Sequence, residues 1–481
     1  MLLSHEHIRD QIMTDFDEAL ESFEKLEQRL NLSEWTVGGV YIWKLARLSI
    51  FRDYLKTLGL QTEAQPESKR LQRTKLQMIK DFPKPLFSAN PFIPGLKDTE
   101  RFVIPHSRKK YINDRYIDPL TQPAWQNQNA STTLLLERAG SPNEPDPSKS
   151  EVSLEVIQRL AWIRRQSTLV RLTDDDRRVI QIIEDSLGLR RLSTGLDLSA
   201  QVKKHARAFL GQKSIFDKLI KLKRPKYLYC VVSYGLEALI DAARANGVRT
   251  IEFQHGTLGR GHLAYDYKGW QFVPYFPDTM LGFGPAWFHD TNFPDQTKRV
   301  MIGNPYLERQ VQSAIGRLEK EPKTLLVISQ GAISEAISRE VVRFAALRPD
   351  WQVIYRPHPG ENSQEIEDRL RDLRDSETVA GSSIKVDAET PFVDQAAAAE
   401  AAVGVYSTAV IEALLSGCRI ALLDLGRSTN AFQHLADQGK ARLVSDGKEL
   451  GGAIDYLPRG DARDYYAEPV HDVTAVVETA L

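Results

Sequence analysis

The sequence is poor in cysteine, and its charges nearly cancel. Only two of its 481 residues are cysteines, Cys230 and Cys418, and both lie within apolar runs. Two such cysteines exclude a disulfide framework and a CxxC metal site, and they are typical of a reducing compartment. The 63 Lys and Arg residues are matched by 64 Asp and Glu residues, for a net charge of -1. Without an overall positive charge, the composition does not support nucleic acid as a partner.

The sequence also lacks a long hydrophobic run. No stretch approaches the roughly 20 apolar residues that cross a bilayer, and charged residues occur too early for a signal peptide. We therefore expect a cytoplasmic protein. Peripheral contact with the inner face of the membrane is an alternative, because residues 38–60 combine apolar residues with Lys44, Arg47, Arg52 and Lys56. Such a helix either lies on anionic lipid or packs on its own domain, and we favour packing.

The chain is long enough for two or three domains. We expect an N-terminal domain over residues 1–298, on the acceptor side, with a helical extension at 1–100 and a helical insertion at 151–223. A C-terminal domain that binds the donor is expected over residues 299–470. The remaining residues, 471–481, are expected to form a helix that packs back across the domain boundary.

Strand and helix patterns alternate from residue 226 onward, which indicates an α/β fold. Tyr227–Val232 and Val248–Phe253 are predicted strands that flank a helix at Gly235–Asn246, and a βαβ unit of this kind has parallel strands. The second half has the same pattern, with strands predicted at Thr324–Ile328, Trp351–Tyr355, Ala402–Val405 and Arg419–Leu423. We predict two Rossmann-like domains that face a cleft.

Two histidine loops follow predicted strands in the two halves. Residues 254–256 (QHG) follow one strand, and residues 356–361 (RPHPGE) follow another. Open α/β sheets bind their ligands at the carboxyl ends of the strands. Two such loops suggest a ligand held between two α/β domains, as in a transferase that uses an activated phosphate donor.

Three strand-end loops in the second half predict a phosphate pocket. The residues expected to bind the donor phosphate are Ser329, Gln330, Gly331, Arg356, His358, Ser407, Thr408 and Glu412. Glycine lets the backbone approach a phosphate, and flanking prolines hold His358 rigidly. A helix that begins near Thr408 presents N–H groups to an anion. Taken alone, Ser407 or Thr408 could instead only cap that helix.

His255 and Asp266 are the candidate catalytic residues of the first half. An acceptor hydroxyl needs a base within hydrogen-bond reach, and either side chain fits that role. A retaining mechanism would instead use Asp266 as the nucleophile. His255 could also bind the donor phosphate or sugar, or cap a turn, and the sequence leaves these roles open.

A basic loop, residues 106–110, follows a predicted strand at 101–105. His106, Arg108, Lys109 and Lys110 could hold an acceptor phosphate, a sugar acid or a second donor phosphate. The alternative is a solvated run of charge. The acidic run at 174–176 is assigned to helix capping rather than to a metal site. We expect no metal and no cofactor.

Four motifs resemble glycosyltransferases of the GT-B fold. They are the QHG loop, the turn at residues 303–305 (GNP), the RPHPGE loop and residues 406–414 (YSTAVIEAL). The resemblance covers residues 225–425 and extends to bacterial enzymes of capsule and lipopolysaccharide O-antigen assembly, among them Kdo transferases, polysialyltransferase-like proteins and transferases of the CDP-glycerol type. It implies two Rossmann-like domains with the active site in the cleft, usually without a metal. It also implies that His358, Ser407 and Thr408 bind donor phosphate.

The resulting hypothesis is a glycosyltransferase. It would transfer a sugar or sugar phosphate from an activated phosphate donor to a growing bacterial surface polysaccharide. CMP-Kdo is one candidate donor, and the basic loop leaves phosphoribosyl pyrophosphate as another. The acceptor would be a glycan or a lipid-linked glycan. The alternatives are an enzyme similar to UDP-sugar 2-epimerases and a non-catalytic scaffold for glycan assembly.

Overall fold

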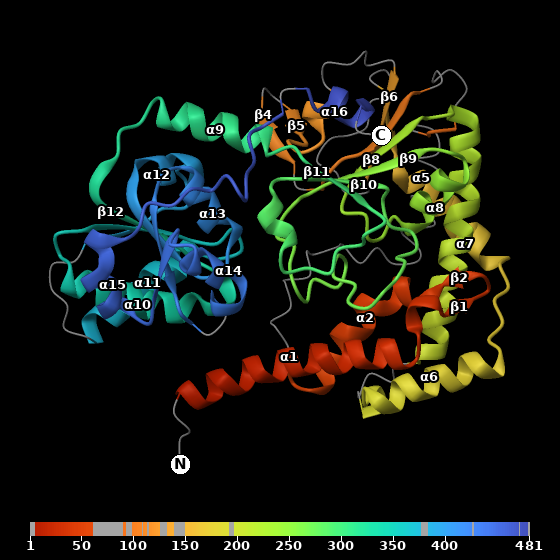
Figure 1. The fold of residues 1–481 in the computed structure, drawn as a ribbon, viewed down its shortest axis with the longest axis horizontal. Helices are drawn as coiled ribbons and strands as arrows, with labels where there is room; N and C mark the ends of the chain where they lie inside the picture. Colours follow the sequence, from red (N-terminus) through yellow and green to blue (C-terminus); the bar gives the residue numbers. More distant parts are fainter. Residues whose placement is uncertain are drawn as a thin grey trace. The chain divides into compact units, whose positions relative to one another are not determined.

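The computed structural model describes residues 5–60, 90–92, 99–107, 109–112, 115–125, 132–138, 150–191, 197–376, 383–425, 428–470 and 472–479. The chain forms two compact units. One comprises Met1–Thr14, Gly284–Ala286 and Gly303–Pro469, and the other comprises Asp15–Phe283, Trp287–Ile302 and Val470–Leu481. Each unit contains one large parallel sheet, which confirms the predicted α/β fold with two Rossmann-like halves (Figure 1). We call them the six-stranded unit and the seven-stranded unit.

The seven-stranded sheet has the strand order β11-β10-β9-β8-β3-β6-β7, and every pair of neighbours is parallel. The chain builds outward from β3 to β7 on one side and from β8 to β11 on the other. The point where the order reverses is therefore the boundary between β3 and β8. The strands are β3 (Arg101–Ile104), β6 (Thr133–Glu137), β7 (Glu151–Ser153), β8 (Tyr227–Val231), β9 (Arg249–Phe253), β10 (Thr279–Gly282) and β11 (Lys298–Met301).

Helices of the predicted extension and insertion belong to the same unit. They include α2 (Ile42–Thr57), α5 (Leu154–Gln166), α6 (Asp174–Ser186), α7 (Leu198–Lys223) and, from Asp15 onward, α1 (His5–Arg29). The unit also contains α8 (Glu237–Ala245) and α16 (Val473–Thr479). It has two short antiparallel hairpins as well. One pairs β1 (Thr36–Val37) with β2 (Val40–Tyr41), and the other pairs β4 (Lys110–Ile112) with β5 (Arg115–Ile117). Much of the segment between α2 and β3, residues 61–89 and 93–98, lies outside the described residues, as does Arg108.

The acidic run before α6 caps that helix. The Thr173 hydroxyl accepts a hydrogen bond from the Asp176 backbone N–H, and the Asp176 carboxylate accepts one from the Thr173 N–H. This reciprocal capping box accounts for Asp176, and the negative charges of Asp174 and Asp175 suit the amino end of the helix dipole. The predicted helix cap is therefore present.

Helix α2 packs inside its own unit. Ile42, Trp43, Ile50 and Phe51 are buried, and the Arg47 side chain is 1% exposed. A helix that rests on lipid keeps its cations at the surface, and here a cation lies in the core. The structure therefore favours the packing alternative for residues 38–60. No helix within the described ranges is long and apolar enough to span a bilayer.

The six-stranded sheet has the order β14-β13-β12-β15-β16-β17, again fully parallel. The strands are β12 (Glu321–Ile328), β13 (Gln352–Arg356), β14 (Ile384–Val386), β15 (Ala399–Gly404), β16 (Arg419–Leu423) and β17 (Ala441–Val444). The helices are α9 (Pro305–Ile315), α10 (Ser334–Leu347), α11 (Ser363–Ser376), α12 (Phe392–Ala398), α13 (Thr408–Leu415), α14 (Ser428–Asp437) and α15 (Gly447–Ala453). Here the order reverses between β12 and β15.

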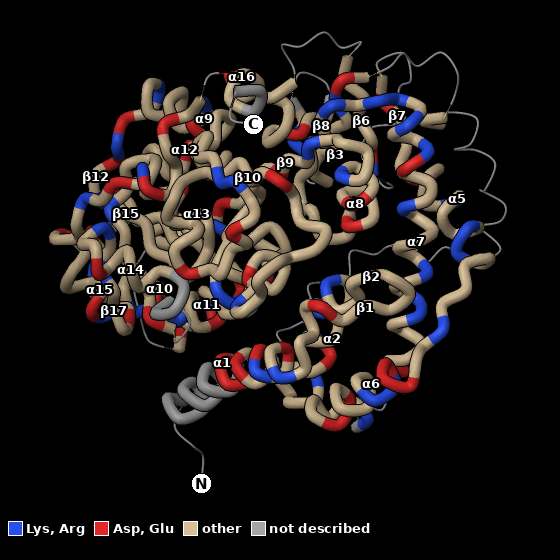
Figure 2. Tube along the Cα trace, turned by 45° about the vertical axis from the view of Figure 1, so that its right-hand side comes forward, with Lys and Arg blue, Asp and Glu red and all other residues tan. Residues whose placement is uncertain are grey.

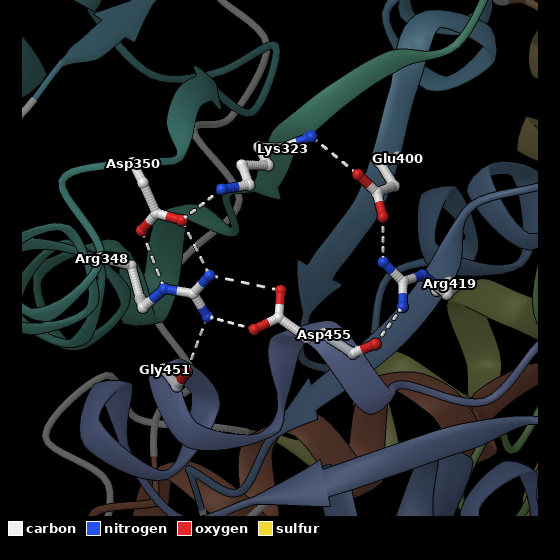
Figure 3. Close-up of polar contacts among 7 residues, drawn as sticks. All are labelled: Lys323, Arg348, Asp350, Glu400, Arg419, Gly451 and Asp455. Carbon is white, nitrogen blue, oxygen red and sulfur yellow. Dashed lines mark hydrogen bonds and ion pairs between the residues drawn. The ribbon is translucent and has the colours of Figure 1, made fainter.

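A charge network lies at the amino ends of these strands (Figure 3). Arg348 donates to both oxygens of Asp350, at 2.9 and 3.0 Å, and to both oxygens of Asp455, at 2.9 and 3.2 Å. Lys323 binds Asp350 through its ammonium group and Glu400 through its backbone N–H. Ligands of open α/β sheets bind at the carboxyl ends of the strands. The network lies at the opposite edge of the sheet.

Candidate functional site

The three predicted phosphate loops follow neighbouring strands of the six-stranded sheet. Residues 329–331 follow β12, residues 356–361 end and follow β13, and residues 406–408 follow β15. A Cβ on Gly331 would lie 3.9 Å from the Glu361 side chain, so the first two loops are adjacent. The loops after β12 and β15 flank the point where the strand order reverses. Open α/β sheets bind their ligands at this point, so the topology brings the predicted loops to the expected place.

The loop after β13 is a tight turn that orients His358. The His358 backbone N–H donates to the Glu361 carboxylate at 2.7 Å, and the Gly360 N–H donates to His358 Nδ1 at 3.2 Å. Because Nδ1 accepts a hydrogen bond, the neutral ring carries its proton on Nε2. The side chain is exposed. It can therefore donate a hydrogen bond from Nε2 to an anion.

The loop after β15 leads into the amino terminus of α13. The Ser407 hydroxyl accepts a hydrogen bond from the Ala409 N–H at 3.3 Å, so Ser407 does cap the helix. Gly404 permits this short turn, because a Cβ there would lie 2.6 Å from the Val410 side chain. Capping and anion binding are compatible, since a helix begins with several unsatisfied N–H groups. Thr408 and Glu412 are half-buried on the first turns.

Two predicted phosphate ligands point into the protein. Ser329 is 3% exposed, and its hydroxyl lies 3.1 Å from the buried Tyr355 hydroxyl. The Arg356 guanidinium donates to the Thr390 carbonyl at 2.5 Å, and burial lowers the pKa of this arginine. These contacts give both side chains a structural role. Gln330, Gly331 and His358 are the more accessible members of the first two loops.

Five aromatic and imidazole rings meet at the carboxyl edge of the seven-stranded sheet. His106 follows β3, Tyr234 follows β8, and His255 follows β9, with ring centroids 5.7 Å apart for the two histidines and 6.3 Å for Tyr234 and His255. The loop beyond β9 adds His262 and Tyr265, whose centroids lie 4.9 Å apart. Since His106 and Tyr234 flank the boundary between β3 and β8, this cluster also lies where the strand order reverses. We call it the histidine cluster.

Arg138 and a strained backbone border the histidine cluster. Val232, just after β8, has φ of 64°, a conformation that β-branched residues rarely adopt. Arg138, just after β6, donates to the carbonyl oxygens of Val231 and Val232 at 3.1 and 3.3 Å. Burial lowers the pKa of Arg138, whereas interaction with Cys230, Tyr234 and Glu252 acts to raise it. Such strain persists where surrounding contacts hold it, commonly at functional sites.

A buried carboxylate lies beneath the histidine cluster. Glu252 is fully buried on β9, and it accepts hydrogen bonds from the Tyr265 hydroxyl at 2.5 Å and from the Ser233 N–H at 2.9 Å. Burial raises the pKa of Glu252 despite these donors. Burial also lowers the pKa of His262, which favours its neutral form. The imidazole that burial keeps neutral is thus that of His262.

Asp266 and Gln254 hold the loop in place. Asp266 is 1% exposed, and its two oxygens accept hydrogen bonds from the backbone N–H groups of Asn292, at 2.8 Å, and Gly261, at 3.1 Å. Gln254 binds the Gly256 carbonyl and the Phe283 N–H, both at 2.8 Å. A carboxylate so engaged has the geometry of a structural residue. The catalytic role predicted for Asp266 gains no support from these contacts.

The side chains of the basic loop after β3 have different surroundings. Lys109 forms an ion pair with Glu137 in which both side chains are 4% exposed. Lys110 is exposed on β4, and the His106 N–H donates to Asp118 at 3.0 Å. Neither predicted alternative fits Lys109, because it is neither solvated nor available to a ligand. His106 is the member of this loop that the structure brings to the histidine cluster.

Sequence reasoning missed Arg138, Tyr234 and Glu252. Tyr234 follows the predicted strand at Tyr227–Val232 closely, so the rule that selected His255 applies to it as well. Glu252 lies inside a strand, where nothing in the sequence distinguishes it from other polar residues. Within the described ranges, no group of three or more His, Cys, Asp or Glu side chains could hold a metal ion.

The chain is similar to several solved structures at low sequence identity. No protein-family model matches the chain, and no curated protein matches its sequence. Among solved structures, it is similar to MurG of Acinetobacter baumannii, with 11% identity, a TM-score of 0.45, and coverage of 79% of this chain and 99% of that one. It is also similar to a UDP-GlcNAc 2-epimerase of Neisseria meningitidis, with 12% identity, a TM-score of 0.44, and coverage of 79% and 98%.

A ugt transferase of Siraitia grosvenorii in complex with UDP has 13% identity and a TM-score of 0.40, with coverage of 76% of this chain and 92% of that one. Scores of this size carry no argument about activity.

Proposed function

We propose that the protein is a glycosyltransferase of the GT-B kind. In this proposal it transfers a sugar or sugar phosphate from an activated phosphate donor to a glycan or lipid-linked glycan of a bacterial surface polysaccharide. CMP-Kdo and phosphoribosyl pyrophosphate are candidate donors. The proposal assigns the donor phosphate to the six-stranded unit and the acceptor to the seven-stranded unit.

The observation that carries the proposal is the geometry at the β12–β15 boundary. An oriented imidazole N–H, a glycine loop and the amino terminus of α13 occupy neighbouring strand ends. Each is a donor toward an anion, and the backbone donors are fixed before a ligand binds. Such an arrangement suits the phosphate of a donor, whose negative charge increases as it leaves.

The histidine cluster supplies the acceptor chemistry of the proposal. A base accepts the proton of the acceptor hydroxyl, and the hydroxyl oxygen forms a bond to the anomeric carbon of the donor. The bond from that carbon to the phosphate oxygen breaks, and the phosphate keeps the electron pair. We assign the base to His255, with His106 and Arg138 as ligands for an anionic group of the acceptor.

The test is a screen of the full-length protein with CMP-, CDP-, UDP- and GDP-sugars and with phosphoribosyl pyrophosphate. Thermal melting finds the donor that binds, and product analysis with and without a glycan acceptor identifies the reaction. Donor turnover that requires the acceptor supports the transferase. Epimerisation or hydrolysis of the donor without an acceptor would indicate the epimerase alternative. If no phosphate donor stabilises the protein, the result would favour the non-catalytic scaffold.

A further inference from the structure

An apolar and basic surface lies at the carboxyl end of α5, in the seven-stranded unit. Trp162 is 55% exposed, Ile163 is 48% exposed, and Leu169 is 85% exposed. Ile163 also lines an open groove of about 560 Å³, together with Leu160, Arg164, Gln166, Ser167 and Ile215. Apolar side chains gathered on one short segment mark an interaction site more often than scattered ones do. We call residues 160–171 the α5 surface.

The charge of this segment has one sign. Residues 156–173 include four arginines and no Asp or Glu. Arg159 pairs with Glu155, whereas Arg164 and Arg171 are exposed and have no ion-pair partner within the described part of the chain. Lys and Arg positions recur along α5 and α7 (Figure 2). The surface therefore attracts an anionic partner.

The packing of α5 leaves this surface outward. Leu154, Ile157 and Ala161 face the core, and Gly211 of α7 approaches α5 so closely that a Cβ would lie 2.9 Å from the Ala161 carbonyl oxygen. Arg207 of α7 donates to the Arg165 carbonyl oxygen at 3.0 Å, which closes the end of the helix. Because α7 holds α5 on one side, Trp162 and Ile163 project on the other.

We propose that the α5 surface docks the protein on an anionic phospholipid bilayer. Exposed tryptophan and leucine next to arginine suit the boundary between headgroups and acyl chains, where the apolar parts insert and the guanidinium groups bind phosphates. A second copy of the chain fits less well, because a symmetric contact would oppose arginine to arginine. The residues differ from those of α2, whose apolar and basic face is buried. This inference goes beyond the proposed function and does not depend on it.

The test is co-sedimentation of the full-length protein with vesicles of phosphatidylcholine alone and with phosphatidylglycerol added. The protein should bind only the anionic vesicles. Arg164→Gln with Arg171→Gln should weaken binding about fivefold per arginine removed. Trp162→Ser with Leu169→Ser should weaken it at least tenfold, because both side chains would insert into the bilayer.

Matched control variants lie elsewhere on exposed surfaces. Arg177→Gln with Arg178→Gln on α6, and Tyr456→Ser in the six-stranded unit, should bind as the wild type does. Melting curves confirm that each variant folds. Failure of the wild type to bind anionic vesicles, or equal binding by every variant, would overturn the proposal. A dimer that Leu169→Ser dissociates would overturn it in favour of contact between copies. Vesicle binding needs no donor, so this result is separate from that of the donor screen.

Discussion

Two histidines in similar strand-end loops have different surroundings. The His358 ring is exposed and receives a hydrogen bond on Nδ1, so its accessible nitrogen is a donor. The His255 ring is half-buried among His106, Tyr234 and Tyr265. An exposed donor suits a ligand that arrives with negative charge. A half-buried ring among other groups that donate and accept protons suits proton transfer.

His255→Ala tests the role proposed for the histidine cluster. Removal of a general base lowers turnover by about 100- to 10,000-fold. The donor should still stabilise the variant as much as the wild type, because its phosphate is assigned to the other unit. Steady-state turnover and donor-dependent melting, measured side by side, check both parts. Full activity of the variant would remove His255 from the base role, and loss of the donor shift would assign it to donor binding.

The direction in which each side chain points could not be predicted from the sequence. Ser329, Arg356 and Lys109 all follow or end strands as predicted, yet each side chain binds a group inside the protein. The strand-end rule locates backbone. The direction of a side chain depends on the partners around it, here Tyr355, the Thr390 carbonyl and Glu137, which come from other parts of the chain.

Among the elements, α2 connects α1 to the loop that carries Tyr265 of the histidine cluster. Arg47 donates to both oxygens of Glu27 on α1, at 2.6 and 2.9 Å, and to the carbonyl oxygens of Leu263 and Asp266, at 2.7 Å each. The last two residues flank Tyr265, whose ring belongs to the cluster. One buried guanidinium thus fixes two helices and the loop, which explains why a charge is retained in this core.

Arg47→Met should therefore destabilise the protein strongly. The change leaves the buried Glu27 carboxylate without its cation, although the Trp43 indole still donates to it. Loss of one member of a buried ion pair costs about 3–5 kcal/mol. Unfolding in urea measures the difference. Arg177→Met is the matched control, because Arg177 forms an exposed pair with Asp174 and such pairs contribute about 0–1 kcal/mol. Equal effects of the two changes would contradict the role given to Arg47.

Individual elements were predictable where local pattern determines them. The predicted strand at Arg419–Leu423 has the bounds of β16. The order of strands was not predicted, because it depends on pairing between distant segments. The order of the seven-stranded sheet shows why His106 and His255 meet, although nearly 150 residues separate them.

At the scale of the whole molecule, the two units share one topology. In each, the first three strands extend to one side and the later strands to the other, which gives one reversal point per sheet. Different chemistry occupies the two points. The seven-stranded unit has imidazole and phenol groups, and the six-stranded unit has backbone donors and His358. This difference is the basis for assigning proton transfer to one unit and phosphate to the other.

Acid should weaken the charge network of the six-stranded unit. Hydrogen bonds from Arg348 and then Lys323 hold the pKa of Asp350 well below its ordinary value. A carboxylate with a lowered folded-state pKa stabilises the protein above its unfolded pKa of about 3.9, and the contribution is lost as the pH falls further. The melting temperature of Asp350→Asn should lie below that of the wild type at pH 7, and the gap should narrow below about pH 5.

Asp290→Asn serves as the control for this pH series. Asp290 is exposed and has no ion-pair partner in the described part of the chain. Its substitution should leave the melting temperature close to that of the wild type across the series. A gap for Asp350→Asn that stays constant as the pH falls would contradict the account of the network.

The central claim is that the carboxyl edge of the six-stranded sheet binds a donor phosphate through His358. The direct measurement is the melting shift that the best donor gives to wild type, to His358→Ala, and to His289→Ala, an exposed histidine of the seven-stranded unit. Donor at 100 times its Kd adds about 2.7 kcal/mol of stability, or roughly 5–10 °C for a unit of this size. The account predicts that His358→Ala loses this shift while melting normally without donor, and that His289→Ala keeps it. An undiminished shift in His358→Ala would contradict the account.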